Sequence, residues 1–358
     1  MITYIFKKVT YGILVLWGVL TLVFYLFNVL PGDPARMMLD KREDSNQLAI
    51  IKHKYGFDRS LGDQYALYLN DVLPLSIHHN SPTAFTSLSS GKYQFKRLFA
   101  IADYTLVAKV PYLRESFVRT GTPVGIILGN TFKNTFVLAF SAILIALFLG
   151  LILGIFSALY KDTFIDKIIL FVSVLGMSLP SFFAAIIIAW FFGFVLHNYT
   201  GLNMTGSLYE VDDYGRGSFL QIKNLILPAI TLGIRPLSVI IQLCRNSLLE
   251  VLSMDYVRTA TAKGLSKFTV IFKHALRNAL NPVVTAVSGW FAYMLAGAVF
   301  VEYIFAWNGI GKEIVDALNK MDLPVVMGSV LFIALIFVLI NLIVDLIYGW
   351  LDPRIRLS

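Results

Sequence analysis

The chain has 358 residues, of which 57% are hydrophobic and only 15% are charged. Soluble domains carry about 25% charged and about 45–50% apolar residues. The composition therefore excludes a disordered chain, a typical cytosolic enzyme and a nucleic-acid-binding protein of the usual basic kind. With a mean hydropathy of +0.71, the sequence indicates an integral membrane protein, and the net charge of +8 is interpreted as a determinant of topology. Cys244 is the single cysteine, which excludes an intrachain disulfide and a cysteine-based metal cluster.

Six stretches are long and apolar enough to cross a bilayer, which takes about 20 residues of α-helix. In chain order, the predicted spans are residues 9–30, 131–160, 168–196, 225–249, 282–301 and 325–350. The first is predicted to be a retained helix, because it is as long as a full span and no small-residue cleavage site follows it. The intervening polar stretch does not span, because its most apolar window, residues 98–113, is interrupted by charges and a proline.

Lys and Arg counts in the short loops predict the orientation of these spans. Residues 245–277 carry six Lys and Arg against two acidic residues, which places them in the cytoplasm. Residues 198–223 and 302–322 lean acidic and are predicted to lie outside. Both chain ends are basic and are predicted to be cytoplasmic, in agreement with an even number of spans. The stretch 31–130 is then external, since long loops translocate largely regardless of their charge.

The external stretch shows two local patterns. Residues 46–73 have Leu and Tyr at helical spacing, which predicts short helices packed as a cap over the outer mouth; the alternative is a loosely ordered loop. His78 and His79 are adjacent but have no nearby cysteine or carboxylate, so no metal site is predicted.

The loop with the most basic charge contains a short segment rich in small residues, DYVRTATAKGL at 255–265. Its composition predicts a compact helix whose backbone approaches a partner closely. Gly264 is expected to end that helix, because glycine adopts the left-handed conformation without steric cost. The alternative is a solvated connector that only keeps positive charge inside.

This segment resembles the EAA motif of ABC-importer permeases, through Arg258-Thr259-Ala260-x-x-x-Gly264. Together with the following HALRNALNP at 274–282, it is similar to the peptide/nickel branch and, within it, to the B-type permease of dipeptide and oligopeptide importers. The general motif has Glu where Arg258 stands and Pro where Arg277 stands, and both replacements look like that branch.

The resemblance extends over nearly the whole chain. Its other pieces, in order, are LPGDP at 30–34, YGFD at 55–58, TGTPV at 120–124, Asn134-Thr135, GMSLPSF at 176–182, LPA at 227–229, Val301-Glu302, WNGIG at 307–311 and DPRIR at 352–356. Residues 75–114 depart from the pattern and look like an insertion. The resemblance implies an all-α, polytopic fold of six transmembrane helices, the type I importer permease fold, with an external segment between the first two helices.

The resemblance also implies a domain organisation. Residues 1–30 form the cytoplasmic N-terminus and first helix, 31–123 the external segment, 124–350 the transmembrane core with a cytoplasmic coupling loop at 250–280, and 351–358 the cytoplasmic C-terminus. The chain is expected to form half of a path for short peptides across the bacterial inner membrane.

The implied partners are a second, C-type permease, two ATPase subunits that bind ATP and Mg, and an extracytoplasmic solute-binding protein; no nucleic acid is implied. This chain has no Gly-x-x-x-x-Gly-Lys-Ser/Thr motif, so the energy must come from a partner, and no cofactor or catalytic residue is expected here. Nickel chelates and glutathione-like compounds are alternative cargoes. A secondary transporter driven by an ion gradient is an alternative class, although the buried carboxylate pairs and repeats typical of it are not evident.

Two sets of site residues follow. The resemblance implies that the coupling segment contacts an ATPase through Asp255, Tyr256, Arg258, Thr259, Ala260, Ala262, Lys263 and Gly264. The second set, Arg235, Ser178 and Pro180, is expected to line the translocation path. The family more often has an apolar residue where Arg235 stands. A central arginine costs about 2.5–3.5 kcal/mol on insertion scales, so it faces a water-filled path or has a structural role toward freed carbonyls near Pro236.

Four further features have both a structural and a functional interpretation. GMSLP at 176–180 superficially resembles a serine-hydrolase elbow, but its second glycine is missing, and Pro180 is expected to kink the span instead. The small-residue pair Gly150 and Gly154 predicts a helix seam, within or between subunits. Asp345 is interpreted as part of a structural ion pair rather than a proton relay, and Glu302 as an interfacial residue.

Overall fold

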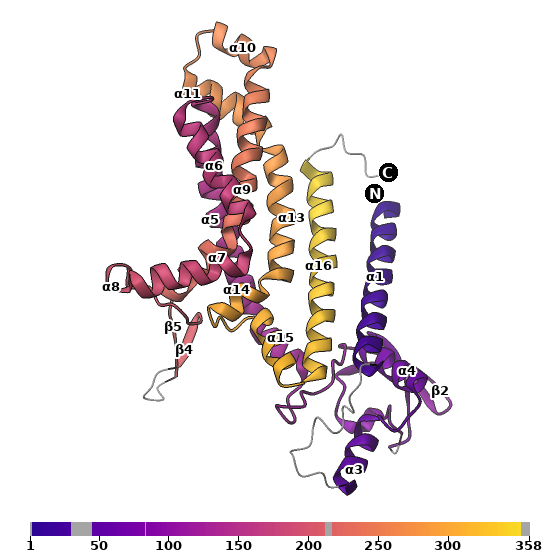
Figure 1. Ribbon diagram of the computed structural model, residues 1–358. Helices are drawn as coiled ribbons and strands as arrows, with labels where there is room; N and C mark the ends of the chain where they lie inside the picture. Colours follow the sequence, from indigo (N-terminus) through magenta and orange to yellow (C-terminus); the bar gives the residue numbers. More distant parts are fainter. Residues whose placement is uncertain (1, 30–44, 83, 212–216, 352–358) are drawn as a thin grey trace. The chain divides into compact units, whose positions relative to one another are not determined.

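The computed structural model of the chain describes residues 2–29, 45–82, 84–211 and 217–351 (Figure 1). The chain divides into two compact units. The first comprises Met1–Gly12, Thr131–Glu313 and Ile333–Ser358, and the second comprises Ile13–Asn130 and Ile314–Phe332. The motif at 30–34 and the predicted C-terminal segment from residue 352 lie outside the described residues.

The first unit consists mainly of apolar helices, as expected where a bilayer leaves no water to pair free backbone groups. Their bounds are α5 Val124–Leu159, α6 Phe164–Ser178, α7 Ser181–Ile188, the π-helix η2 Ala189–Val195, α8 His197–Thr200, α9 Lys223–Leu252, α13 Asn281–Gly297 and α14 Val299–Ile304. A small hairpin, β4 Tyr209–Val211 paired with β5 Ser218–Leu220, precedes α9. The core of the unit lies between α5, α9 and α13.

Helix α5 packs closely on α9 through its glycines. A Cβ atom built on Gly150 would lie 2.6 Å from Cγ2 of Ile240, and one on Gly154 would lie 2.7 Å from Cβ of Cys244. Neither position has room for a methyl group, so the two backbones meet here at a distance that only glycine allows. The glycine pair is therefore a seam inside this chain, which the sequence alone left open.

Four helices in the described part of the chain are long and apolar enough to cross a membrane: Phe6–Asn28, Val124–Leu159, Lys223–Leu252 and Leu323–Leu346. A fifth crossing requires Phe164–Ser178 and Ser181–Val195 to be taken together, although they are bent by 109°. The predicted span 168–196, with a kink at Pro180, is thus corrected to two segments with a sharp break. Helix α13 has 17 residues and rises about 26 Å, somewhat less than the roughly 30 Å of a hydrocarbon core. A count of six spans therefore requires that both the broken pair at 164–195 and α13 cross the membrane.

The second unit contains the predicted short helices, α3 (Ser45–Tyr55) and α4 (Leu61–Val72), which are confirmed. It also contains a three-stranded antiparallel sheet that the sequence analysis did not predict. The strands are β1 (Leu75–His79), β2 (Phe95–Ile101) and β3 (Tyr104–Lys109), in the order β1-β3-β2. The sheet lies within the stretch interpreted as an insertion, and the apolar window 98–113 belongs largely to the β2–β3 hairpin.

Asp71, in the last turn of α4, ties that helix to the sheet. Its carboxylate accepts hydrogen bonds from the Tyr93 hydroxyl at 2.7 Å and from Nε of Arg114 at 3.4 Å, and its carbonyl accepts one from Nζ of Lys109 at 2.9 Å. The Lys109 ammonium also lies 4.2 Å from the centre of the Tyr93 ring. Burial lowers the pKa of Lys109 to about 8 and raises the pKa of Tyr93 above its ordinary value.

His78 lies inside the same sheet and has a structural environment. The side chain is fully buried. Its Nδ1 is 2.8 Å from the Thr86 carbonyl oxygen and its Nε2 is 2.9 Å from the Ser76 hydroxyl. Both ring nitrogens are therefore engaged within the protein, and neither is left to bind a metal.

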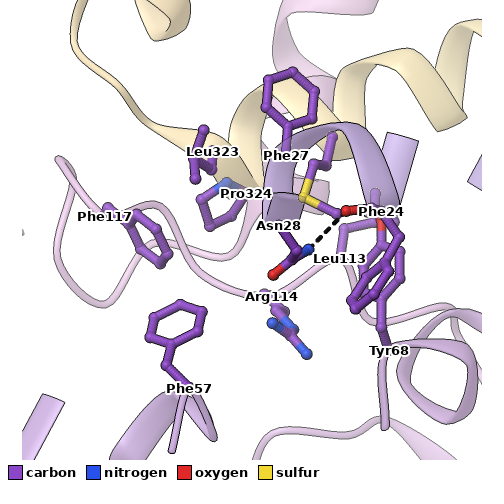
Figure 2. A pocket seen from close by; sticks show the side chains of 11 residues that line it. Phe24, Phe27, Asn28, Phe57, Tyr68, Leu113, Arg114, Phe117, Leu323 and Pro324 are labelled. Atoms are coloured by element: carbon purple, nitrogen blue, oxygen red, sulfur yellow. Dashed lines mark hydrogen bonds between the residues drawn. The ribbon is translucent and has the colours of Figure 1, made fainter. Parts of the chain in front are cut away.

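A small aromatic pocket of about 30 Å³ lies in the second unit, at the end of α1 (Ile2–Val29). Figure 2 shows its lining, in which Phe57 and Phe117 lie on one side and Phe24 and Tyr68 on the other. The Nδ2 of Asn28 donates a 2.8 Å hydrogen bond to the Phe24 carbonyl within the last turn of α1. A space of this size holds about two waters, so the pocket is too small to enclose a whole peptide.

Within the first unit, the start of α1 runs antiparallel to the later part of α16 (Leu323–Leu351). Nζ of Lys8 is 2.8 Å from Oδ2 of Asp345, and a Cβ on Gly12 would touch Val338 at 2.7 Å. Asp345 is thus in an ion pair, as interpreted from the sequence, and its partner is Lys8.

Candidate functional site

The loop between α9 and α13 folds into four short helical segments. They are α10 (Asp255–Ala262), α11 (Lys267–Thr269), the π-helix η3 (Val270–Ala275) and α12 (Leu276–Ala279). Figure 1 shows α10 and α11 beyond the end of α9, well away from α7 and α14. Gly264 has φ +79°, in the left-handed region, and lies just after the C-cap residue Lys263. The predicted helix and its glycine stop are confirmed.

The inner face of α10 is buried against the rest of the unit. Val257 is 4% exposed and Ala260 is 7% exposed, and both pack in an apolar cluster with Leu248, Val251 and Val270. These contacts hold α10 against the end of α9 and the start of η3. The helix is therefore a packed extension of the unit rather than a solvated connector.

The outer face of α10 carries nearly all the residues that the family resemblance implies for coupling. Exposed side chains are those of Asp255, Tyr256, Arg258, Thr259, Ala262 and Lys263, and Gly264 is exposed as well. Ala260 alone of the eight points inward. Arg258 lies 3.6 Å from Asp255, but both side chains are largely in solvent, so this pair adds little stability. The face is free to meet another molecule.

Apolar side chains enlarge this exposed surface, and the sequence analysis did not identify them. The ring of Phe268 is 70% exposed and lies 4.5 Å, centre to centre, from the ring of Phe272. Met254 and Leu265 are also exposed. Exposed apolar groups rimmed by basic residues are typical of a protein-binding surface. The sequence carries a signal for them in the apolar FTVIF run at 268–272.

Behind this loop, a buried ion pair ties α6 to α9. Arg245 donates from Nε and Nη2 to the two carboxylate oxygens of Asp166, at 2.8 and 2.7 Å. Asp166 also accepts from the Ser157 hydroxyl at 2.5 Å and from the Asp162 backbone N–H at 2.9 Å. The forked geometry suits the arginine side chain, so the end of α9 that carries α10 is held rigidly to α6.

The second candidate region is the break between α6 and α7, at Leu179 and Pro180. Pro180 cannot donate a backbone hydrogen bond, and its ring excludes continued helix. Gly176, one turn earlier, has no room for a side chain, because a Cβ there would lie 2.6 Å from the Ser238 hydroxyl. Close packing on α9 and the proline together fix the 109° bend.

Arg235 projects from α9 to this break. Its Nη2 lies 3.4 Å from the Leu179 carbonyl oxygen, one of the carbonyls that the broken helix leaves without a helical partner. This contact agrees with the structural interpretation of Arg235, except that the carbonyl belongs to the break in α6 rather than to the neighbourhood of Pro236. The side chain also lines a cavity, so the path interpretation stays a prediction.

The other two residues expected at the path flank the break without lining that cavity. The Ser178 hydroxyl donates to the Val174 carbonyl of its own helix at 2.9 Å, and Pro180 forms the N-cap of α7. Both are exposed in this chain. The cavity is instead lined by their neighbours Leu179 and Ser181.

Glu302 is fully buried, which corrects its interpretation as an interfacial residue. Its carboxylate accepts hydrogen bonds from the Thr135 hydroxyl at 2.7 Å and from the backbone N–H groups of Gly311 and Lys312 at 2.7 and 3.3 Å. These amides belong to the first turn of α15 (Ile310–Asn319). Glu302 therefore caps α15 and joins it to α5.

Two comparisons with known proteins bear on these features. Residues 150–357 match the family described as "Binding-protein-dependent transport system inner membrane component". Residues 1–87 match the model for the N-terminal part of such membrane components. The first match includes α10, the α6–α7 break and Glu302.

Curated relatives are similar to the chain over its full length. A dipeptide transport system permease protein of Alkalihalophilus pseudofirmus is 33% identical over 99% of this chain and 100% of its own. A di/tripeptide transport system permease protein of Pseudomonas aeruginosa is 34% identical over 99% of each chain. A glutathione transport system permease protein of Salmonella choleraesuis is 32% identical over 99% of each.

Proposed function

The chain belongs to the family of binding-protein-dependent transport system inner membrane components, and we propose that it forms half of an ATP-driven path for short peptides. The full-length similarity to permeases named for dipeptides and di/tripeptides supports this cargo class. The relative named for glutathione transport carries a compound that is itself peptide-like. The protein is a multi-pass component of the inner membrane, and its role is transport rather than catalysis.

The proposed orientation puts both chain ends and α10 in the cytoplasm. The basic loop at 245–277 supports it through the distribution of Lys and Arg. The antiparallel pairing of Lys8 with Asp345 also supports it, because it keeps the start of α1 and the end of α16 at the same side. The stretch 31–123 then lies outside, where a solute-binding protein delivers its cargo.

The partners that complete the transporter are a second permease and two ATPase subunits, which bind ATP and Mg. The observation that carries this proposal is that α10 has one buried face and one exposed face. Its inner face is packed into the unit through Val257 and Ala260, and its outer face is exposed. A force applied to that outer face by an ATPase passes directly into α9 and, through Arg245 and Asp166, into α6.

The residues proposed to contact the ATPase are those on and beside this face, namely Asp255, Tyr256, Arg258, Thr259, Ala262, Lys263 and Gly264, with Ala260 seating the helix from behind. Arg235, Ser178 and Pro180 are proposed to border the path at the break between α6 and α7. A helix broken at membrane depth is tolerated where it lines a cavity or is covered by protein. A position beside the translocation path meets this condition.

The coupling role is tested with Gly264→Arg, and Gly264→Asn serves as the matched control. A Cβ at Gly264 would meet nothing within 4 Å, so an arginine side chain has room within this chain and would clash only with a docked partner, while its backbone is strained at φ +79°. Asparagine tolerates the left-handed conformation, whereas arginine pays about 1–2 kcal/mol there. We expect both variants to insert normally, with peptide uptake lost in Gly264→Arg and largely kept in Gly264→Asn. Wild-type uptake by Gly264→Arg would refute the coupling assignment.

A further inference from the structure

Arg235 is a cation in the middle of an apolar helix. It lies about 18 Å along the axis from the start of α9 and about 26 Å from its end. A charge at such a depth is costly in lipid, and it is retained where it meets a partner or a water-filled cavity. The surroundings of Arg235 therefore have to supply an ionic or hydrogen-bonding partner, or water, that offsets the cost of the charge.

The described residues supply little of what this guanidinium requires. An arginine side chain has five N–H donors. The hydrogen bond from Nη2 to the Leu179 carbonyl is 3.4 Å long, beyond the usual range, and Nε is buried without any hydrogen-bond partner. Within the part of the chain that the structure describes, no carboxylate forms an ion pair with Arg235. The positive charge is thus left without a counter-charge.

The guanidinium lines a cavity of about 30 Å³ inside the first unit. Leu179 and Ser181 border it from the break, and Trp290 and Tyr293 border it from α13. One water requires roughly 10–15 Å³ of such space, so the cavity holds about two oxygen-sized groups. A carboxylate, which has two oxygens on one carbon, matches both the size and the charge.

The break adds a second source of positive potential at the same place. Helix α7 starts at Ser181, and its N-cap, Pro180, provides no side-chain hydrogen bond. The first N–H groups of a helix lack partners in the helix itself, and its dipole places partial positive charge there. Discontinuous membrane helices that point such ends at an anionic substrate group are a known arrangement in transporters.

From this juxtaposition we propose that Arg235 and the first turn of α7 form a subsite that binds a carboxylate of the transported peptide. The inference rests on the proposed function, because it assigns the ligand from the cargo class. A peptide presents its C-terminal carboxylate whatever its side chains are, so the subsite recognises a group that all cargoes share. Trp290 and Tyr293 provide the apolar wall beside it.

The test uses the complete transporter in proteoliposomes with its binding protein, and the probes are dialanine and dialanine amide. Each peptide is supplied at a concentration that saturates the binding protein, as determined by a separate titration. The variants are Arg235→Gln, which keeps a donor for the Leu179 carbonyl but removes the charge, and Arg235→Lys, which keeps the charge. Lys223→Gln removes a positive charge from the first turn of the same helix and is the matched control.

We expect the wild type to transport dialanine about tenfold faster than its amide. Arg235→Gln should lower dialanine transport about tenfold and leave amide transport nearly unchanged, since losing one partner of a desolvated charge pair costs at least this factor. Arg235→Lys should keep most of the preference for dialanine, and Lys223→Gln should keep all of it.

Three results would overturn the subsite. The first is dialanine transport by Arg235→Gln at the wild-type rate. The second is an equal loss of both peptides in Arg235→Gln, which would indicate a structural role toward Leu179. The third is reduced co-purification of the second permease with this variant, which would identify that subunit as the source of the carboxylate. Failure of the proposed function is recognised separately, because the wild type would then transport neither peptide.

Discussion

Replacement of Glu302 tests whether one buried side chain holds the start of α15 in place. The two informative variants are Glu302→Leu and Glu302→Gln. In the structure the carboxylate receives three hydrogen bonds, from the Thr135 hydroxyl and from the backbone N–H groups of Gly311 and Lys312. Leucine fills similar space but accepts none of them.

The expected magnitude follows from these three donors. A buried donor without an acceptor costs about 1–3 kcal/mol, so leucine should destabilise the start of α15 by at least about 3 kcal/mol. Glutamine still offers one oxygen to the two α15 amides. Its NH₂ group would face the Thr135 oxygen, which already accepts from the Ile310 N–H at 2.9 Å. Loss of one charge-assisted bond gives about 1.5–3 kcal/mol for glutamine.

Amide hydrogen exchange of residues 302–312 in lipid nanodiscs measures this local stability. A loss of 3 kcal/mol corresponds to roughly hundredfold faster exchange by local opening, and the glutamine variant should fall between leucine and wild type. Glu250→Gln, at an exposed position near the end of α9, is the matched control and should change nothing. Unaltered protection in Glu302→Leu, or equal effects of leucine and glutamine, would refute the capping argument.

Two further predictions concern buried charges. Arg245→Met leaves Asp166 buried and unpaired, so it should destabilise the protein by about 3–5 kcal/mol. The double variant Arg245→Met with Asp166→Leu should cost clearly less than the sum of the two single variants. Thermal denaturation of the wild type, both single variants and the double variant in detergent measures this, and additive effects would contradict the ion pair. Burial lowers the pKa of Lys109 to about 8 from 10.5, so the unfolded chain binds more protons between these values and stability should rise with pH from 8 to about 10. Above about pH 10 the raised pKa of Tyr93 opposes this gain. The rise should be absent in Lys109→Met, and a wild type that loses stability over this window relative to Lys109→Met would contradict the assignment.

The long apolar helices were predictable because their signal is local. Helices α5 and α9 are each longer and more apolar than a soluble helix needs to be. The predicted span 225–249 falls inside α9, and the predicted span 131–160 ends one residue beyond α5. The helix α10 and its stop at Gly264 were equally local, since a left-handed glycine ends a helix whatever surrounds it.

The break in the third predicted span was only half predictable. Pro180 indicated a kink, but the size of the bend depends on how α6 packs against α9, and Gly176 meets Ser238 and Ile234 from a distant part of the sequence. Glu302 shows the same limit more strongly. Its Thr135 partner is 167 residues away, so no window of sequence reveals that the carboxylate is buried.

The sheet of the second unit was missed for a different reason. The window 98–113 was tested only for its ability to span, whereas Tyr104 to Lys109 alternates exposed and buried positions at the period of a strand. This alternation is not visible in the residue types, because polar Thr105 and Lys109 are buried while Tyr104 and Leu106 are exposed.

The seam between α5 and α9 has a practical consequence for chemical labelling. Cys244, the single cysteine of the chain, has no exposed surface, and Gly154 lies so close that a Cβ there would be 3.1 Å from its sulfur. A maleimide or a spin label in water does not reach a thiol sealed between two helices. The natural chain therefore serves as its own unreactive background. A cysteine introduced at Thr259 or Lys263 would be the one accessible thiol of this chain, ready for cross-linking to whatever docks on α10.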